Sequence, residues 1–239
     1  EETGRFEVAL ERFRAVPEGE RGWIAQLRVA AMLGKLGRVD EARRYLADLP
    51  AVTREQRVQV QQAEAQVLRD AGNNAAAYTV LASALDQFPD DPDLLYDMAM
   101  VAEKLDHIDV VEQKLTRLIE LKPANAHALN ALGYTLVDRT PRVAEGLALI
   151  ERALALSPDD PFILDSVGWA HYRMGRLDDA ETHLRRAMEL RPDPEIAAHL
   201  GEVLWAKGER TQAQDVWQTQ LKSSPDNAVL LETVRRLTR

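Results

Sequence analysis

Residues 161–193, which read PFILDSVGWAHYRMGRLDDAETHLRRAMELRPD, decide the fold. In their first half, four residues fall at i, i+3, i+4 and i+7, which is one face of a helix. This first stripe consists of Leu164, Val167, Gly168 and His171. Gly175-Arg176 interrupts the pattern, a second stripe follows, and Pro192 ends it. The second stripe consists of Leu177, Ala180, Leu184 and Ala187. The stretch therefore predicts two antiparallel helices joined by a tight turn.

The same register recurs along the chain, as in a repeat architecture. We place repeats at 23–57, 58–91, 92–125, 126–160, 161–193 and 194–227. A small residue where the two helices cross recurs in the first helix as Ala30, Ala65, Ala99, Gly133, Gly168 and Gly201. The matching position of the second helix holds Ala42, Ala77, Val111, Gly146, Ala180 and Ala213. A proline that ends the second helix, as Pro192 does, recurs as Pro89, Pro123, Pro158, Pro192 and Pro225.

This register resembles the tetratricopeptide repeat, and in 161–193 the resemblance is carried by Gly168, Tyr172, Gly175, Ala180, Ala187 and Pro192. It implies an all-α, right-handed superhelical solenoid of helical hairpins. Residues 1–22 match the second helix of a truncated repeat, so we expect the native protein to extend upstream. Residues 228–239 are expected to form a capping helix over the last apolar face. Repeat 126–160 has one extra residue near its turn, at Asp138-Arg139-Thr140-Pro141.

Composition excludes several classes of protein. No run of eighteen apolar residues occurs, so no membrane span is expected. The net charge is −9 and the basic residues are dispersed, which argues against nucleic acid as a partner. The absence of cysteine removes disulfides and thiolate metal sites.

No catalytic pattern is found either, so we expect no enzyme, no cofactor and no metal. The acidic pairs Asp90-Asp91 and Asp159-Asp160 precede first helices, where Asp caps free amides, so capping is preferred over cation binding. No histidine pair has the spacing of a metal site, and His171 is expected to be a satisfied core residue. Phosphate-binding glycine loops and a serine nucleophile elbow are also missing.

The resemblance places the first helices on a concave surface, where positions two, five, nine, twelve and thirteen of each repeat point inward. Aromatic residues there, bordered by polar ones, are typical of binding hot spots. The predicted protein-binding residues are Tyr96, Met100, Asn130, Tyr134, Asp165, Trp169, Tyr172, Arg173, Glu202 and Trp205. For Tyr172 a role in packing alone stays open, and Trp217 is expected to pack in the core. The Lys and Asn pattern by which some tetratricopeptide modules clamp a carboxylate is absent.

The stretch from Ala128 to Trp217 resembles a narrower family. Its phrases ALNALGYTLVDRT, ILDSVGWAHYRMGRLDDAETHLRRA and AAHLGEVLWAKGERTQAQDVW are similar to bacterial outer-membrane lipoproteins with tetratricopeptide repeats that face the periplasm. One branch of that family is the adaptor of a carboxyl-terminal processing protease that degrades cell-wall hydrolases. The resemblance implies a non-catalytic adaptor, anchored through a lipidated segment upstream, which binds this protease, its substrates, or both.

Two other functions remain open at this point. The chain could be a structural scaffold or assembly factor of another envelope complex, such as a pilus or a secretion apparatus. It could also be the regulatory module of a larger protein. The segment upstream would decide between them, because a lipidation signal favours an envelope protein and a catalytic domain favours the module.

Overall fold

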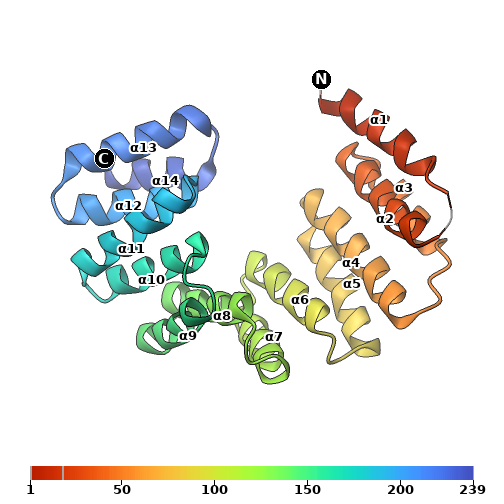
Figure 1. The fold of residues 1–239 in the computed structure, drawn as a ribbon, viewed down its shortest axis with the longest axis horizontal. Helices are drawn as coiled ribbons and strands as arrows, with labels where there is room; N and C mark the ends of the chain where they lie inside the picture. Colours follow the sequence, from red (N-terminus) through yellow and green to blue (C-terminus); the bar gives the residue numbers. More distant parts are fainter. Residues whose placement is uncertain (1, 18, 239) are drawn as a thin grey trace. The chain divides into compact units, whose positions relative to one another are not determined.

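The computed structural model describes residues 2–17 and 19–238, and over these it contains helices joined by turns and loops, with no strand. The all-α prediction is therefore confirmed (Figure 1). Contacts divide the chain into two compact units, Glu1–Leu121 and Lys122–Arg239. The first unit contains α1 (Glu2–Arg14), α2 (Glu20–Lys35), α3 (Val39–Ala47), α4 (Arg54–Asp70), α5 (Asn74–Gln87), α6 (Pro92–Lys104) and α7 (Ile108–Leu121). The second contains α8 (Ala126–Arg139), α9 (Val143–Leu156), α10 (Pro161–Arg173), α11 (Leu177–Leu190), α12 (Pro194–Ala206), α13 (Arg210–Ser223) and α14 (Ala228–Leu237).

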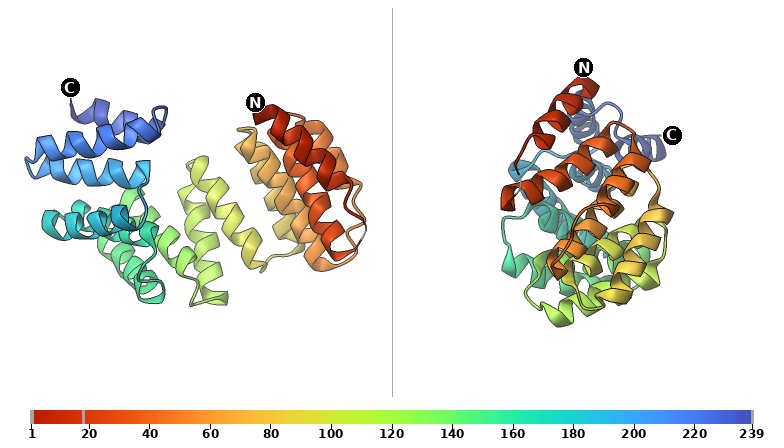
Figure 2. Two further views of the ribbon diagram at one scale, coloured as in Figure 1. Left: turned by 45° about the horizontal axis from the view of Figure 1, so that its top comes forward. Right: turned by 90° about the vertical axis from the view of Figure 1, so that its right-hand side faces the viewer.

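From residue 92 on, each repeat range placed from the sequence contains one pair of these helices, and the two helices of a pair lie side by side (Figure 2). In the first two ranges the first helix begins earlier than placed, because α2 begins at Glu20 and α4 at Arg54. In the terminal ranges, α1 lies within 1–22 and α14 within 228–239. Positions 1, 18 and 239 of those ranges lie outside the described residues.

The second residue of each acidic pair acts as a cap, as predicted, whereas Asp90 and Asp159 instead accept from Arg117 and Arg186. Asp91 accepts the backbone N–H groups of Asp93 and Leu94 at 3.2 and 3.3 Å, and Asp160 accepts those of Phe162 and Ile163 at 2.9 and 3.1 Å. A proline follows each cap at the first helical position, where its missing N–H has no cost. These two features fix where α6 and α10 begin.

Most hairpins turn through a residue in the left-handed region, and one does not. Gly175, between α10 and α11, has φ +76°, which glycine adopts without strain. Between α8 and α9 the chain instead passes through Thr140 in an extended conformation. The Thr140 hydroxyl donates to the Leu136 carbonyl at 2.7 Å and accepts the Arg142 N–H at 3.0 Å. This is the turn where the sequence has its extra residue.

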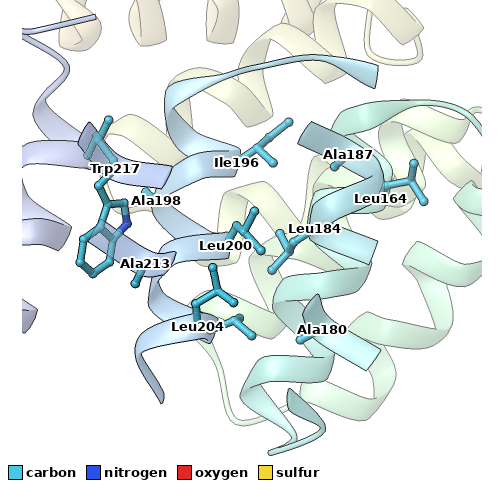
Figure 3. Close-up of a cluster of buried hydrophobic side chains, with 12 residues drawn as sticks. Leu164, Ala180, Leu184, Ala187, Ile196, Ala198, Leu200, Leu204, Ala213 and Trp217 are labelled. Atoms are coloured by element: carbon cyan, nitrogen blue, oxygen red, sulfur yellow. The ribbon is translucent and has the colours of Figure 1, made fainter. Parts of the chain in front are cut away.

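The small residues lie where the helices cross, as predicted, and the core forms around them. A Cβ on Gly133 would lie 2.7 Å from the Gly146 carbonyl oxygen, so these two backbones touch. Between α10 and α13, Leu184, Leu200 and Trp217 belong to one buried cluster (Figure 3). The expectation for Trp217 is confirmed, because only 1% of it is exposed. The expectation for His171 is wrong in one respect, because its buried Nδ1 has no hydrogen-bond partner. Its ring stacks instead on His183, with centroids 5.4 Å apart.

None of the described helices combines the length and the apolar character that a bilayer crossing requires.

Candidate protein-binding site

The predicted binding residues fall in both units. Tyr96 and Met100 lie on α6 of the first unit, where both are partly buried. The others lie on α8, α10 and α12 of the second unit, which pack in succession. The site is therefore described for the second unit by itself.

Trp169 stacks between a tyrosine and a histidine of the second unit, and a second tyrosine lies beside the histidine. The Trp169 ring lies 4.2 Å from the His199 ring and 4.9 Å from the Tyr172 ring, and both pairs are close to parallel. Tyr134 lies 6.3 Å from His199 in a tilted arrangement. The stack thus joins α8, α10 and α12 through their first-helix faces.

A carboxylate fixes the histidine. Both oxygens of Asp165 lie near His199 Nδ1, at 2.9 and 3.0 Å. Because an ionised carboxylate only accepts hydrogen bonds, Nδ1 carries the hydrogen. Burial of the imidazole opposes its charge, yet the carboxylate of Asp165, aided by Glu202 and Asp138, raises the pKa of His199. The contact with Asp165 on α10 therefore favours the protonated, positively charged form of His199 on α12.

A second carboxylate joins α8 to α10. The Trp169 indole Nε1 donates to Asp138 Oδ1 at 3.1 Å. Arg173 Nη1 donates to the Asp138 backbone carbonyl at 3.0 Å and lies 3.6 Å from Oδ1 of the same residue. Asp138 thereby orients both the central ring of the stack and a guanidinium beside it.

A third carboxylate joins α10, α12 and α14. The Tyr172 hydroxyl donates to Glu202 Oε1 at 3.2 Å, and Arg236 Nη2 donates to Glu202 Oε2 at 2.5 Å. Burial of the phenol and the nearby Glu202 carboxylate raise the pKa of Tyr172, so the hydroxyl remains protonated and donates. We call these connected residues the network: Tyr134, Asp138, Asp165, Trp169, Tyr172, Arg173, His199, Glu202 and Arg236.

Burial separates the predicted residues into two kinds. Trp169, Asp165 and Glu202 are at most 8% exposed, so they shape the network and offer a partner little surface. Tyr134 and Tyr172 are partly exposed and Arg173 is exposed. These three residues can touch a partner directly.

Trp205 lies partly buried at the edge of the α12–α13 hairpin. Its ring is 5.7 Å from that of Trp217, and the Arg210 guanidinium lies 4.9 Å from its centroid. A cation over an indole is attracted to the ring's negative face. Trp205 thus combines core packing with a partly exposed face.

Sequence reasoning omitted His199, Asp138 and Arg236 from the predicted site. His199 follows the inward position of its repeat by one residue, so the register did not select it. Its spacing was the available signal, because it lies 34 residues, or one repeat, after Asp165. The position of Arg236 depends on α14 packing against α12.

The first unit has a related link between neighbouring first helices. Gln62 Nε2 on α4 donates to Asp97 Oδ2 on α6 at 2.7 Å, over a separation of 35 residues. Burial raises the pKa of Asp97, although the bond from Gln62 and the Arg69 charge oppose the shift. We call such side-chain links rungs; Gln62–Asp97 and Asp165–His199 are two of them. Asn130 holds the corresponding position on α8, and its buried Oδ1 has no partner.

Among the described residues, no three His, Cys, Asp or Glu side chains gather closely enough to hold a metal ion. The network's own polar groups instead bond to one another. Its chemistry is that of a preorganised surface, with aromatic rings and guanidinium groups held in place by buried and partly buried acidic residues.

Comparison with known proteins agrees with the repeat fold. Family models described as tetratricopeptide repeat match residues 58–101, 96–161 and 161–194, which together span more than half of the chain. The TPR repeat-containing protein PA4667 of Pseudomonas aeruginosa is 44% identical over 194 residues, which is 81% of this chain. The chain spans only 33% of the length of that relative.

Solved structures show the same fold. A thermophilic TPR protein of Thermus thermophilus, TTC0263, superposes with a TM-score of 0.68 at 22% identity, covering 76% of this chain and 99% of its own. A tetratricopeptide repeat protein from Parabacteroides merdae gives a TM-score of 0.75 at 14% identity, covering 100% of this chain and 94% of its own. The repeat register, the helical hairpins and the matching family models agree: the chain belongs to the tetratricopeptide repeat family.

Proposed function

We propose that this chain is a non-catalytic adaptor that binds a periplasmic carboxyl-terminal processing protease, its cell-wall hydrolase substrates, or both. Tetratricopeptide repeats generally mediate protein–protein interactions, which supports the binding role. An adaptor acts by holding enzyme and substrate together, so that their effective concentration rises without any chemistry of its own. In this proposal the native protein is anchored to the outer membrane and faces the periplasm.

The observation that carries the proposal is the network of the second unit. It lies within the stretch 128–217 that resembles the protease-adaptor lipoproteins, apart from Arg236 on α14. Its members open to a partner include two partly exposed tyrosine rings and two guanidiniums, and Tyr and Arg are enriched among the residues that dominate binding energy at protein interfaces. Hydrogen bonds to Glu202 and Asp138 hold Tyr172, Arg236 and Arg173 in place, so less conformational entropy is lost when a partner docks.

The proposal is tested by reconstitution with purified components. A carboxyl-terminal processing protease and a cell-wall hydrolase are incubated with and without the chain, and loss of intact hydrolase is followed over time. We expect the chain to accelerate degradation. The Tyr134→Ala variant should reduce the acceleration, because Tyr134 is a partly exposed ring of the network.

The matched control is Arg185→Gln. Arg185 is an exposed arginine on α11, paired with Glu181 and outside the network. This variant should accelerate degradation as the unchanged chain does. No acceleration and no co-purification with either protein would refute the adaptor role. Recovery of stoichiometric envelope-assembly subunits from a periplasmic extract would favour the scaffold function instead.

A further inference from the structure

We propose that Arg173 and Arg236 form a two-cation site on the network, which receives acidic side chains of a partner protein segment. The inference rests on the proposed binding function and specifies the chemistry of the partner. Its basis is that the network's hydrogen bonds hold both guanidiniums in place while leaving part of each exposed.

The carboxylate of the Glu202–Arg236 pair is buried and its cation is exposed. The Glu202 side chain is 7% exposed, whereas that of Arg236 is 53% exposed. A guanidinium has five N–H donors, and the bond to Glu202 comes from Nη2. The remaining exposed part of Arg236 can form a charge-assisted hydrogen bond with a further carboxylate.

Arg173 on α10 is also held by an acidic residue, Asp138, but here the acidic side chain is partly exposed (31%). Its contacts with Asp138 come from Nη1, and a third of its side chain (33%) remains exposed. A guanidinium positioned by its own protein has already lost much of its rotational freedom, so a partner that binds it has less entropy to remove. Both arginines are therefore preorganised.

The two guanidiniums converge on Tyr172. Arg236 and Tyr172 donate to the same Glu202 carboxylate, and Arg173 contacts Asp138, which also accepts from Trp169. The charges of both arginines accordingly act on the Tyr172 phenol. The Tyr172 ring in turn stacks on Trp169. A partner residue placed at this point would meet two cations beside an aromatic surface.

Two of the nearby carboxylates already accept hydrogen bonds within the network, and a third lies close to Arg236. Asp165 faces His199, and Glu202 accepts from Tyr172 and Arg236. Glu232, one turn before Arg236 on α14, is exposed and adds negative charge near that guanidinium. The occupant that complements two preorganised arginines beside aromatic rings is a segment carrying Asp or Glu next to apolar residues.

The test measures binding of synthetic peptides to the full chain by fluorescence anisotropy. The probe is a fluorescein-labelled peptide of repeated Glu-Glu-Phe, and the control peptide replaces each Glu by Lys. We expect the acidic peptide alone to bind, with affinity that falls as salt rises from about 0.05 M to about 0.3 M. Arg173→Gln combined with Arg236→Gln should weaken its binding about tenfold or more.

Two single variants sharpen the result. Arg185→Gln, the exposed arginine of α11, should change the affinity less than about twofold, and Glu232→Gln should strengthen binding by about twofold because it removes a competing carboxylate. Far-UV circular dichroism confirms that each variant is folded. Equal binding of the acidic and basic peptides, no binding of the acidic peptide, or an equal loss in Arg185→Gln overturns the proposal.

The outcome is separable from that of the adaptor function. If the double variant loses the acidic peptide but still accelerates degradation of the hydrolase, the two-cation site exists and the protease system docks elsewhere. If the acidic peptide does not bind while the unchanged chain accelerates degradation, the adaptor function stands and the two-cation site is refuted.

Discussion

Replacing Gly201 by Ala should disrupt the crossing between α12 and α13. A Cβ on Gly201 would lie 2.7 Å from Trp217 Cδ1 and closer still to Trp217 Nε1. Real Cβ atoms essentially never approach so closely, and the indole is rigid and 1% exposed, so the whole ring must move. Overpacking of this kind costs up to about 3 kcal/mol. The better helix propensity of Ala returns about 1 kcal/mol, which leaves a net loss of about 2 kcal/mol.

A second substitution turns this estimate into a test of mechanism. Trp217→Leu alone opens a cavity at a cost of about 3 kcal/mol, and it also removes a buried indole N–H that has no acceptor, which returns about 1 kcal/mol. In the double variant the added methyl group enters the space that the indole leaves. We therefore expect the double variant to be more stable than either single variant, with a coupling energy of about 3 kcal/mol.

The assay is urea unfolding of the four proteins followed by circular dichroism at constant protein concentration. Gly4→Ala serves as the control, because a Cβ there meets nothing within 4 Å and reports helix propensity alone. Additive effects of Gly201→Ala and Trp217→Leu would show that the close crossing is not the reason for glycine at this position.

His199 has a higher pKa in the folded chain than in the unfolded chain, so its ion pair with Asp165 stabilises the fold. This stabilisation is fully present below the unfolded pKa of about 6.5 and is lost as pH rises through the folded pKa. His199→Gln should therefore destabilise the chain more at pH 6 than at pH 9 in urea unfolding, and a pH-independent difference would contradict the ion pair. Trp169→Phe keeps a ring in the stack but loses the bond to Asp138, so thermal unfolding should show a loss of about 1 kcal/mol; no loss would mean that this bond is not formed in solution. Thr53 forms a capping box at the start of α4, so Thr53→Ala should cost about 1 kcal/mol and speed hydrogen exchange in the first turn of α4 while leaving peptide binding at the network unchanged.

The hairpins could be predicted because their determinants are local and repeated. Gly168 and Ala180 are small because two helices touch at those positions, and Pro161 and Gly175 mark a beginning and a turn. These requirements act within one repeat of the sequence. Each copy therefore gives the same information again, and the register becomes unambiguous.

The network could be predicted only in part, because its bonds join residues from different repeats. The register placed Trp169 and Glu202 on the first-helix face, yet it could not show that neighbouring side chains bury both. His199 was missed because its importance comes from Asp165, which belongs to the preceding repeat. Whether an aromatic residue at such a position packs or binds depends on the side chain opposite, which a single repeat does not specify.

The rungs make the order of the repeats part of the structure. Asp165 meets His199 across 34 residues, and Gln62 meets Asp97 across 35, so each rung requires two particular repeats to be neighbours. A gene rearrangement that removed residues 161–193 in register would bring Asn130 next to His199, replacing the ion pair with a neutral amide contact. The hairpins would still stack, but the pairing of polar partners would change. Selection on such rungs would oppose the gain, loss and shuffling of repeats that helical arrays otherwise tolerate. Among relatives, the two residues of a rung, one repeat apart, would then change together.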